Sequence, residues 1–312
     1  MKLYINNARE NWVVDRFINE WNQENYKTVS SYVRNPDLMW LIAPWTWEKE
    51  SKRKLLRNKV LCTIHHIDED KFYYSGNTLD GEENFMKRDK FVDHYHVISQ
   101  KTYQQVSKLT TKPITVIPFW VNQNIWFEIK EKDFLREKYQ FDRNDFLVGS
   151  FQRDTEGHDL KSPKLSKGPD RFIEIVKTFN KNYQNLCVVL TGKRREYILS
   201  ELEKEGIKYK YFEMTDFETV NELYNLLNLY IVSSRYEGGP QAILECATTK
   251  TPIISTDVGI AASVLHEDSI FNMDNYQNAT PNVDYAYNKV LKYQLPIGFK
   301  SFNNLLKRIN EN

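Results

Sequence analysis

The residues best suited to chemistry lie between Ser233 and Glu245, in the run SSRYEGGPQAILE. A strongly apolar segment ends there in small residues, and a carboxylate (Glu237), two glycines and a proline follow it. Glycines at the start of a helix let backbone N–H groups face a ligand, and a helix N-terminus favours anionic or strongly polar groups. Because Glu245 follows Glu237 by roughly two helical turns, both carboxylates can project from the same face. Carboxylates with this spacing suit the paired hydroxyl groups of a ribose and a hexose.

The same run also fits a helix that binds no ligand. In that interpretation Glu237 lies at the start of a capped helix and Glu245 on its solvated side, and the spacing alone gives both interpretations similar weight. The common nucleotide-binding motifs are absent, since the sequence contains no GxG, GxxxxGKS or GxxxxGKT. Only Gly76 and Gly81 come before residue 149, which disfavours a dinucleotide-binding turn after the first strand.

Composition narrows the class of protein. With 312 residues the chain is long enough for about two domains. Lys and Arg number 43 and Asp and Glu 42, a balance that argues against a dedicated nucleic-acid-binding protein. No apolar stretch approaches the ~18 residues of a membrane span, and the polar start is unlike a signal peptide. The three scattered cysteines indicate neither a disulfide framework nor a zinc site, so a cytoplasmic protein is expected.

Short apolar runs alternate with amphipathic stretches along the chain, the pattern of an α/β protein. In the first half, strands are expected near 2–6, 38–43, 60–64, 94–98 and 114–118, with helices that include 12–21 and 48–57. The charged stretch 126–143 lacks strand character and is predicted to bridge the halves. In the second half, strands at 146–151, 186–191, 209–213, 229–233 and 252–256 alternate with helices at 169–180, 194–205, 218–227 and 240–248. Two parallel sheets with a cleft between their carboxyl ends make a natural ligand site.

The run from Glu237 to Glu245 resembles the E-x7-E region of the retaining GT-B glycosyltransferases of family 4, and further matches follow along the chain. Residues 62–65 (CTIH) are similar to the family's "vTvH" strand end, and 96–99 (HVIS) to its "vvavS" strand end. Residues 116–121 (VIPFWV) resemble its interdomain "VIPNGVD" segment. The run VGSF followed by KGPD, at 148–151 and 167–170, is similar to its "vGRl..eKG.d". The likeness spans residues 1–270, is strongest over 146–260, and fits a short-chain branch of the family best.

This resemblance implies the GT-B fold, two Rossmann-like α/β/α domains whose parallel sheets face an interdomain cleft. The expected parts are an acceptor-side domain at 1–125, a connection at 126–145, a nucleotide-sugar-binding domain at 146–285 and a helical tail at 286–312 that packs back on the first domain. The implied reaction moves a sugar from a UDP- or GDP-linked donor to a carbohydrate hydroxyl, on a lipid-linked glycan in some members, with retention of configuration. The family uses no cofactor or metal and no established protein nucleophile, and the donor phosphate is thought to deprotonate the acceptor.

The family's functional residues carry over to matching positions of this chain. By the resemblance, Glu237 would hold the hydroxyl groups of the donor sugar and Glu245 those of the ribose. Lys167, with Arg153, would neutralise the diphosphate as the leaving group gains charge. His65 would approach the sugar from the first domain, unless it is an ordinary hydrogen-bonded histidine at a strand end. The remaining donor contacts expected are Gly238, Gly239, Pro240 and Met214.

Two segments depart from the family pattern. Ser150 stands where the family has a phosphate-binding arginine, and an extra loop precedes Lys167. Arg153 and Lys164 are both candidates to replace that arginine, and the sequence leaves the choice open. The usual glycine-rich first loop is replaced by residues 6–12 (NNARENW), so the acceptor half cannot be read from better-known members.

Tryptophan is confined to the first part of the chain, with all seven residues at or before Trp126. The flat face of a tryptophan stacks on the apolar face of a sugar, and carboxylate or amide groups accept its hydroxyls. Because the donor residues follow residue 149, the first half is expected to bind a carbohydrate acceptor. The contacts expected are Glu10, Asn11, Trp12, Trp45 and Trp47.

Two weaker patterns each allow two interpretations. Asp68, Glu69 and Asp70 contain the DxD motif that binds a metal diphosphate in another glycosyltransferase fold, but a chance match in a solvated loop explains it, and no metal site is predicted. Six cations between Lys49 and Lys59 suit either an anionic membrane surface or a solvated helix.

Two other functions fit the same architecture. The first is a sugar-nucleotide epimerase or hydrolase, which would release free nucleotide without an acceptor. The second is a non-catalytic subunit that binds a sugar nucleotide, and loss of Glu237 or Lys167 would have supported it. Both residues are present.

Overall fold

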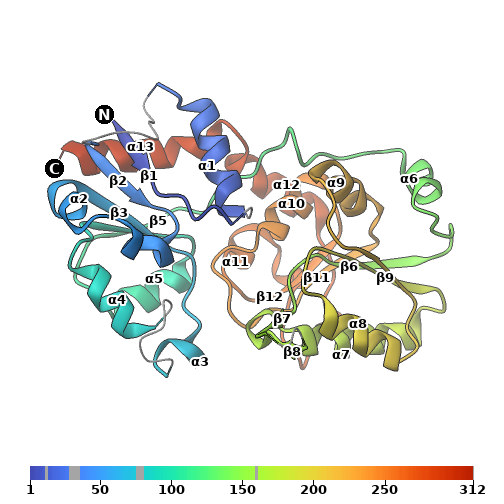
Figure 1. The fold of residues 1–312 in the computed structure, drawn as a ribbon. Helices are drawn as coiled ribbons and strands as arrows, with labels where there is room; N and C mark the ends of the chain where they lie inside the picture. The colour runs from blue at the N-terminus through green and yellow to red at the C-terminus, as the bar shows by residue number, and fades with distance from the viewer. Residues whose placement is uncertain (11–12, 28–35, 75–80, 159–160, 312) are drawn as a thin grey trace. The chain divides into compact units, whose positions relative to one another are not determined.

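The structure is a computed structural model that describes residues 1–10, 13–27, 36–74, 81–158 and 161–311 (Figure 1). By its internal contacts the chain divides into two compact units. Unit 1 comprises Met1–Phe119 and Pro296–Asn312, and unit 2 comprises Trp120–Leu295. The division falls inside residues 116–121, the segment that resembles the family's interdomain segment. Each unit contains one large parallel sheet, so the predicted α/β class with parallel sheets is confirmed.

Unit 1 is built on a five-stranded sheet of order β1-β2-β3-β4-β5, in which every neighbouring pair is parallel. The strands are β1 (Leu3–Ile5), β2 (Leu38–Leu41), β3 (Lys59–Ile64), β4 (His94–Val97) and β5 (Ile114–Val116). All of β2, and all of β3 except its first residue, is buried. Strands covered on both faces carry continuous apolar runs, which is why these segments can be recognised in the sequence.

Helices cover both faces of the unit 1 sheet (Figure 1). They are α1 (Val13–Glu24), α2 (Lys52–Arg57), α3 (Glu69–Phe72), α4 (Glu82–Asp89), α5 (Gln100–Val106) and α13 (Ile297–Glu311). On one face, Trp21 of α1 and Phe302 of α13 both contact the ring of Trp40 in β2. On the other face, Phe85 of α4 packs in a cluster with Met39. The last helix of the chain therefore completes the core of unit 1.

Unit 2 is built on a six-stranded parallel sheet of order β10-β9-β6-β11-β12-β13. Its strands are β6 (Phe146–Ser150), β9 (Leu186–Thr191), β10 (Tyr209–Phe212), β11 (Leu229–Val232), β12 (Ile253–Thr256) and β13 (Ile270–Phe271). A separate antiparallel ribbon consists of β7 (Thr155–Glu156) and β8 (Ser162–Pro163). The strands predicted in both halves are all present, with ends that differ by a few residues.

The helices of unit 2 are α6 (Lys132–Lys138), α7 (Pro169–Asn182), α8 (Glu196–Lys204), α9 (Phe217–Leu226), α10 (Gln241–Thr249), α11 (Ala261–Val264) and α12 (Val283–Val290). α7 and α8 cover one face of the sheet, where Phe172 and Ile198 pack with Val148 of β6 (Figure 1). α9 and α10 lie on the other face, where Tyr224 of α9 contacts Tyr230 of β11.

Two segments differ from the predicted elements. The helix expected at 48–57 is interrupted at Glu50, whose extended backbone separates a short 3-10 helix (Pro44–Lys49) from α2. The Glu50 carboxylate accepts a hydrogen bond from the Tyr4 hydroxyl at 2.8 Å, a long-range contact that local sequence cannot reveal.

The charged stretch expected to bridge the halves contains α6 and packs on unit 2. The backbone N–H groups of Phe127 and Ile129 donate to the side chains of Asn221 and Asn225 in α9, at 3.1 and 2.7 Å. These asparagine side chains accept hydrogen bonds from the backbone of the segment, as a neighbouring strand would. Strand propensity does not predict contacts of this kind.

Candidate functional site

Most of the predicted donor residues lie in loops at one edge of the unit 2 sheet, and Glu245 lies on helix α10. Because the strands of this sheet are parallel, the loops after β6, β11 and β12 all emerge at its carboxyl edge. Lys167 and Gly168 come between β8 and α7, and Glu237 lies between β11 and α10.

Gly168 brings the loop before α7 against the end of β11. Its backbone is left-handed, with φ +62°, and a Cβ added there would lie 1.9 Å from the Ser233 carbonyl oxygen. The Ser233 hydroxyl in turn donates to the Gly168 carbonyl at 2.8 Å. Only glycine combines this conformation with so close an approach. The position of Lys167, one residue earlier, depends on this contact.

Arg235 joins the same two loops a second time. The backbone N–H groups of Arg235 and Tyr236 donate to the Ser166 carbonyl, at 2.8 and 3.1 Å. The Arg235 guanidinium donates to both carboxylate oxygens of Asp170, at 2.7 and 2.6 Å. Burial raises the pKa of Asp170, but the hydrogen bonds and charge of Arg235 outweigh this and hold it below its ordinary value. The two loops are therefore positioned by main-chain and bidentate contacts together.

These contacts place Lys167 and Glu237 side by side, and the Lys167 ammonium forms an ion pair with the Glu237 carboxylate. Their side chains are only 16% and 11% exposed. Two residues that are 70 positions apart in sequence, each predicted to contact the donor, thus meet in one site.

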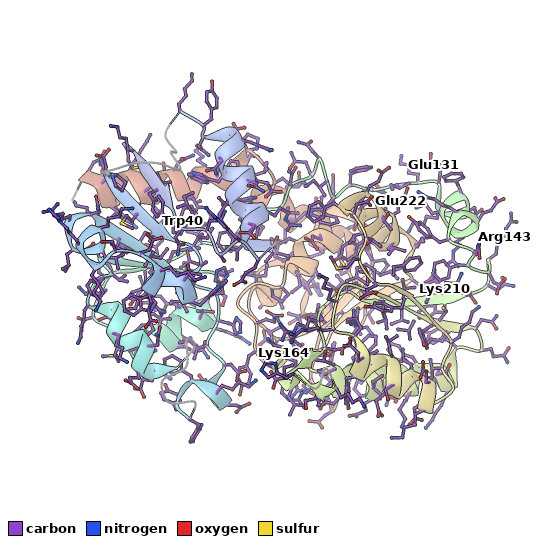
Figure 2. All side chains as sticks on the ribbon, viewed as in Figure 1. Trp40, Glu131, Arg143, Lys164, Lys210 and Glu222 are labelled. Atoms are coloured by element: carbon purple, nitrogen blue, oxygen red, sulfur yellow. The ribbon has the colours of Figure 1, made fainter. Side chains whose placement is uncertain are left out.

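Two more cations belong to the same region of unit 2. Burial lowers the pKa of Lys164, and the charges of Lys167 and Arg153 lower it further, so these three side chains form a positively charged cluster. Arg153 comes just before β7 and Lys164 (labelled in Figure 2) just after β8, so the β7–β8 ribbon places both. The Arg153 guanidinium donates to the Thr155 carbonyl at 2.8 Å. Ser150, which stands in place of the family's arginine, is buried.

A buried ion pair beneath the ribbon was not identified from the sequence. Arg195, just before α8, has no exposed side-chain surface, and its Nε donates to Asp154 at 2.7 Å. Its Nη1 donates to the carbonyls of Ser150 and Thr191, the last residues of β6 and β9, at 2.6 and 2.8 Å. Nothing in the sequence distinguishes Arg195 from its neighbour Arg194, so only the fold reveals this role.

Glu245 is buried on α10, with 7% of its surface exposed. Its carboxylate accepts a hydrogen bond from the Tyr224 hydroxyl of α9 at 2.9 Å. Burial raises the pKa of Tyr224 well above its ordinary value, and the charge of Glu245 adds to the effect, so the hydroxyl stays protonated and donates. This contact holds the Glu245 carboxylate in one orientation.

Glu237 and Glu245 do not share a helix face, and the spacing argument for them was wrong. α10 begins at Gln241, and Pro240 is the residue before it, with φ −55° and ψ 113°. Pro240 was expected in the first turn, as Pro169 is in α7, but its ψ is not helical. Glu237 therefore lies in the preceding loop.

Gly259, after β12, is a further residue of this edge that the sequence analysis missed. It has φ +52°, and a Cβ there would lie 2.3 Å from the Gly238 carbonyl oxygen and 2.8 Å from that of Glu237. The hydroxyl of Thr256, the last residue of β12, donates to the Ser234 carbonyl at 2.7 Å. Its place soon after the end of a predicted buried strand could have indicated that Gly259 lies at this edge.

Met214, also expected on the donor side, lies in the loop after the edge strand β10 and is 64% exposed. It emerges at the same carboxyl edge of the sheet. Its role stays a prediction.

In unit 1, two of the residues predicted to contact the acceptor, Glu10 and Trp45, lie together with His65, which was predicted to approach the sugar. The Trp45 indole N–H donates to Glu10 at 3.1 Å, and the rings of Trp45 and His65 have centroids 5.7 Å apart. His65 Nε2 lies 2.8 Å from the Ile42 carbonyl oxygen, and because a carbonyl only accepts, Nε2 carries the proton in this contact. The group lies at the carboxyl ends of β2 and β3.

Trp47 does not belong to this group. It is 4% exposed, packs in the core cluster with Met39 and Phe85, and its indole N–H donates to Asn84 at 2.9 Å. Its ring has no face open to a sugar, which corrects the expectation of an acceptor contact. Asn11 and Trp12 lie outside the described residues.

The remaining histidine of the family match, His96, is fully buried in β4. Its Nδ1 lies 3.0 Å from the Thr63 hydroxyl, which also accepts the Trp40 indole N–H at 2.8 Å. Its Nε2 lies 2.7 Å from the Ile117 carbonyl. Burial lowers the pKa of His96 to about 3, so the ring is neutral and structural.

The two weaker patterns fall on the surface of unit 1. Glu69 and Asp70 are exposed in the first turn of α3, and the described residues contain no group of three or more His, Cys, Asp or Glu side chains able to hold a metal ion. The cations from Lys49 to Arg57 are exposed together with Leu56, which is 71% exposed. Within the part of the chain that the structure describes, no helix is both long and apolar enough to cross a bilayer.

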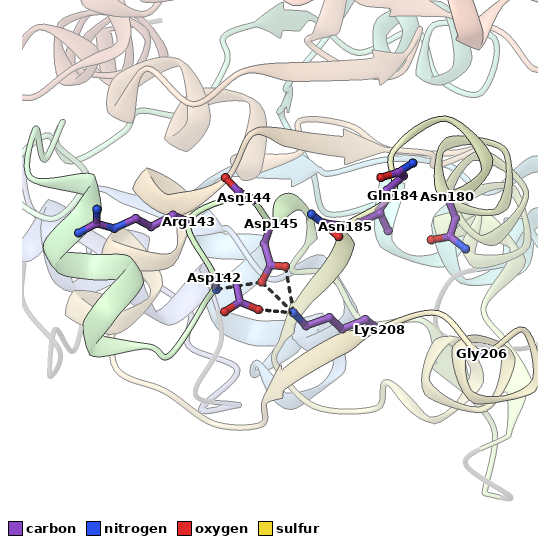
Figure 3. Close-up of a pocket in the computed structure, with 10 residues that line it drawn as sticks. Asp142, Arg143, Asn144, Asp145, Asn180, Gln184, Asn185, Gly206 and Lys208 are labelled. Atoms are coloured by element: carbon purple, nitrogen blue, oxygen red, sulfur yellow. Dashed lines mark hydrogen bonds and ion pairs between the residues drawn. The ribbon is translucent and has the colours of Figure 1, made fainter.

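A polar hollow of about 590 Å³ lies at the opposite, amino-terminal edge of the unit 2 sheet (Figure 3). Asp145, Asn185 and Lys208, which immediately precede β6, β9 and β10, line it. Lys208 forms ion pairs with Asp142 and Asp145 there. None of the residues predicted to bind donor or acceptor lines this hollow.

The fold is shared with several solved structures. Sucrose-phosphate synthase from Thermosynechococcus elongatus is 15% identical, with a TM-score of 0.70 over 97% of this chain and 80% of that one. HepE from Anabaena, solved in complex with UDP-glucose, is 12% identical, with a TM-score of 0.72 over 98% and 99% of the two chains. A glycosyltransferase from Rickettsia africae is 16% identical, with a TM-score of 0.65 over 98% and 84%. These similarities confirm the predicted GT-B fold class.

Sequence comparison reaches part of the chain. No protein of curated function matches the sequence significantly. Residues 161–286, the part of unit 2 that holds Lys167, Glu237 and Glu245, match the family model described as Glycosyl transferases group 1.

Proposed function

We propose that this protein is a glycosyltransferase that moves a sugar from a nucleoside-diphosphate donor to a carbohydrate hydroxyl with retention of configuration. The observation that carries the proposal is the meeting of Lys167 and Glu237 beside the Arg153 and Lys164 cations. This site lies at the carboxyl edge of a parallel sheet, where nucleotides bind in open α/β folds. It also lies largely within the segment that matches the group 1 glycosyltransferases. HepE, which has the same fold, was solved with UDP and with UDP-glucose.

The donor's diphosphate would bind at the cationic cluster. Lys167, Arg153 and Lys164 offer three positive charges, and charge-assisted hydrogen bonds to phosphate oxygens are among the strongest in proteins. Negative charge grows on the diphosphate as the bond to the sugar breaks, and fixed cations at that position stabilise the transition state more than the ground state. Under this proposal protein cations neutralise the leaving group, so no metal ion is required.

The donor's two sugars would bind the two carboxylates. The Glu245 carboxylate, already oriented by Tyr224, would accept hydroxyl groups of the ribose, and Glu237 those of the transferred sugar. The backbone of Gly238 and Gly239, before α10, would face the donor between them.

The acceptor would be bound by unit 1. Trp45 is only partly buried and combines an aromatic face with the Glu10 carboxylate, a pair that suits a sugar. His65 contacts the same indole and would approach the reacting sugar. The exposed cations of α2, with Leu56 beside them, suit an anionic membrane surface and hence a lipid-linked acceptor.

The proposal is tested by ligand binding followed by transfer. A thermal-shift panel of UDP, GDP, ADP and their hexose conjugates should raise the melting temperature for one base, because binding to the native state stabilises it. Transfer with that donor should persist in excess EDTA, and the anomeric configuration of the product read by NMR should match that of the donor. Binding of none of these nucleotides would overturn the proposal, and faster release of free nucleotide without an acceptor would favour a hydrolase.

A further inference from the structure

Lys167 and Glu237, the two residues proposed to contact the donor's diphosphate and its sugar, form an ion pair with each other. Both side chains are mostly buried, in contrast to Lys177 and Glu205, a pair on the surface of unit 2 whose side chains are 44% and 29% exposed. A largely buried pair is poorly screened by solvent, and removing one partner leaves the other charge uncompensated. A ligand that binds the Lys167 ammonium in place of Glu237 therefore leaves the Glu237 carboxylate without its opposite charge.

A diphosphate and a diphosphate-sugar differ at this point. A phosphate group that takes the Lys167 ammonium brings negative charge beside the Glu237 carboxylate, which loses its partner and is repelled. A hexose on the diphosphate offers hydroxyl groups that donate to the carboxylate and replace the lost ammonium. A bare diphosphate offers Glu237 no donor in return.

The surrounding charges strengthen this difference. Burial and the charges of Lys167 and Arg153 lower the pKa of Lys164, and the Glu237 charge raises it, so Glu237 interacts with Lys164 as well as with its ion-pair partner Lys167. The Glu237 charge thus offsets part of the repulsion between Lys167 and Lys164, and a bound diphosphate would replace it in that role.

We propose that Glu237 competes with phosphate for Lys167 and thereby makes the site prefer a nucleoside-diphosphate-sugar to the nucleoside diphosphate left after transfer. This inference rests on the proposed function, since it takes the cluster as the diphosphate site. It assigns to Glu237 a role in expelling product as well as in holding the donor sugar.

The test is isothermal titration calorimetry of wild type and Glu237→Gln with three ligands: inorganic pyrophosphate, the nucleoside diphosphate selected by the thermal-shift panel, and its glucose conjugate. Glutamine keeps the size and hydrogen-bonding capacity of the side chain but removes the charge. We expect the variant to bind pyrophosphate and the nucleoside diphosphate at least about fivefold more tightly, equivalent to ~1 kcal/mol. The glucose conjugate should gain nothing or bind more weakly, so the preference for it falls.

Three variants complete the experiment. Glu205→Gln breaks the exposed Lys177–Glu205 pair and should leave all three affinities unchanged. Lys167→Gln combined with Glu237→Gln should abolish the gain for pyrophosphate, because the freed ammonium is then absent. Glu237→Asp keeps the charge with a shorter reach and should give a smaller gain, which provides a second measurement if Glu237→Gln fails to fold.

The outcomes distinguish failure of the competition between Glu237 and phosphate from failure of the proposed function. If wild type binds the nucleoside diphosphate but Glu237→Gln binds it and pyrophosphate no more tightly, the competition idea is wrong while the proposed function stands. If wild type binds no nucleotide and no pyrophosphate, both fail. Equal tightening for all three ligands would also overturn the inference, since it would reflect net charge and no selection between them.

Discussion

Replacing Gly168 with alanine should destabilise unit 2 by more than a left-handed backbone alone explains. Alanine in that conformation costs about 1–2 kcal/mol. The new Cβ would also lie 1.9 Å from the Ser233 carbonyl oxygen, and relieving such a clash costs a further ~1–3 kcal/mol. The free energy of unfolding should therefore fall by about 2–5 kcal/mol. Because Lys167 precedes Gly168, nucleoside-diphosphate affinity should fall as well.

Gly206 provides the matched control. Its φ of +65° is nearly that of Gly168, but nothing lies within 4 Å of an added Cβ. Gly206→Ala should thus cost only the conformational part, about 1–2 kcal/mol, and leave nucleotide binding unchanged. Thermal unfolding followed by circular dichroism compares the variants, and ~1–3 kcal/mol between them corresponds to roughly 2–12 °C for a domain of this size. Equal melting temperatures for the two variants would refute the reasoning, since the close approach to Ser233 would then add no cost to the alanine substitution.

Three further predictions concern the two carboxyl edges and the core of unit 1. Glu245→Ala should weaken nucleotide-sugar binding by about 1.5–3 kcal/mol in calorimetry, the worth of hydrogen bonds to a charged group, with a smaller loss for Tyr224→Phe; unchanged affinity removes Glu245 from the site. Trp45→Ala should raise the acceptor KM or lower kcat and leave donor binding intact, whereas Trp45→Phe, which keeps an aromatic face, should lose less; an equal loss of donor affinity would contradict an acceptor role. Burial lowers the pKa of His96 to about 3 from an ordinary 6.5, so the unfolded chain binds a proton first as pH falls, and His96 contributes a decline in stability of about 1.4 kcal/mol per pH unit below about 6.5. Burial also lowers the pKa of His94, to about 4, which adds to this decline. Urea unfolding at pH 8 and pH 5 should show a shallower pH dependence in His96→Gln than in wild type.

The fold could be predicted from the sequence because its strands are continuous apolar runs. Strands β2, β3 and β9 are buried almost throughout, and such runs stand out against the charged helices between them. Where a long-range contact decides the local conformation, prediction failed. The predicted helix is interrupted at Glu50, whose carboxylate accepts a hydrogen bond from Tyr4, 46 residues earlier in the sequence.

The candidate site could be predicted only in part, for a related reason. The glycines, proline and strand end around Glu237 and Glu245 drew attention to these two carboxylates, and the family resemblance pointed to Lys167; their roles stay predictions. Trp47 and Trp45 look equivalent in sequence, yet one is 4% exposed in the core and the other contacts Glu10 on a partly exposed face. Burial is a property of the packed fold, so aromatic residues two positions apart cannot be assigned from the sequence alone.

The β7–β8 ribbon bears on how the proposed diphosphate site could lack an arginine at position 150. Ser150 is 1% exposed, and its carbonyl accepts from Arg195, a cation already committed to Asp154 and fully buried. That buried pair supplies no charge to a ligand, but Asp154 lies next to Arg153, and its carbonyl accepts the backbone N–H of Lys164 at 2.7 Å. The extra loop before Lys167 therefore does more than lengthen the chain. It forms the β7–β8 ribbon, which is flanked by Arg153 and Lys164, and Lys164 interacts electrostatically with both Arg153 and Lys167. Under the proposed function these two cations replace the charge of the family's arginine.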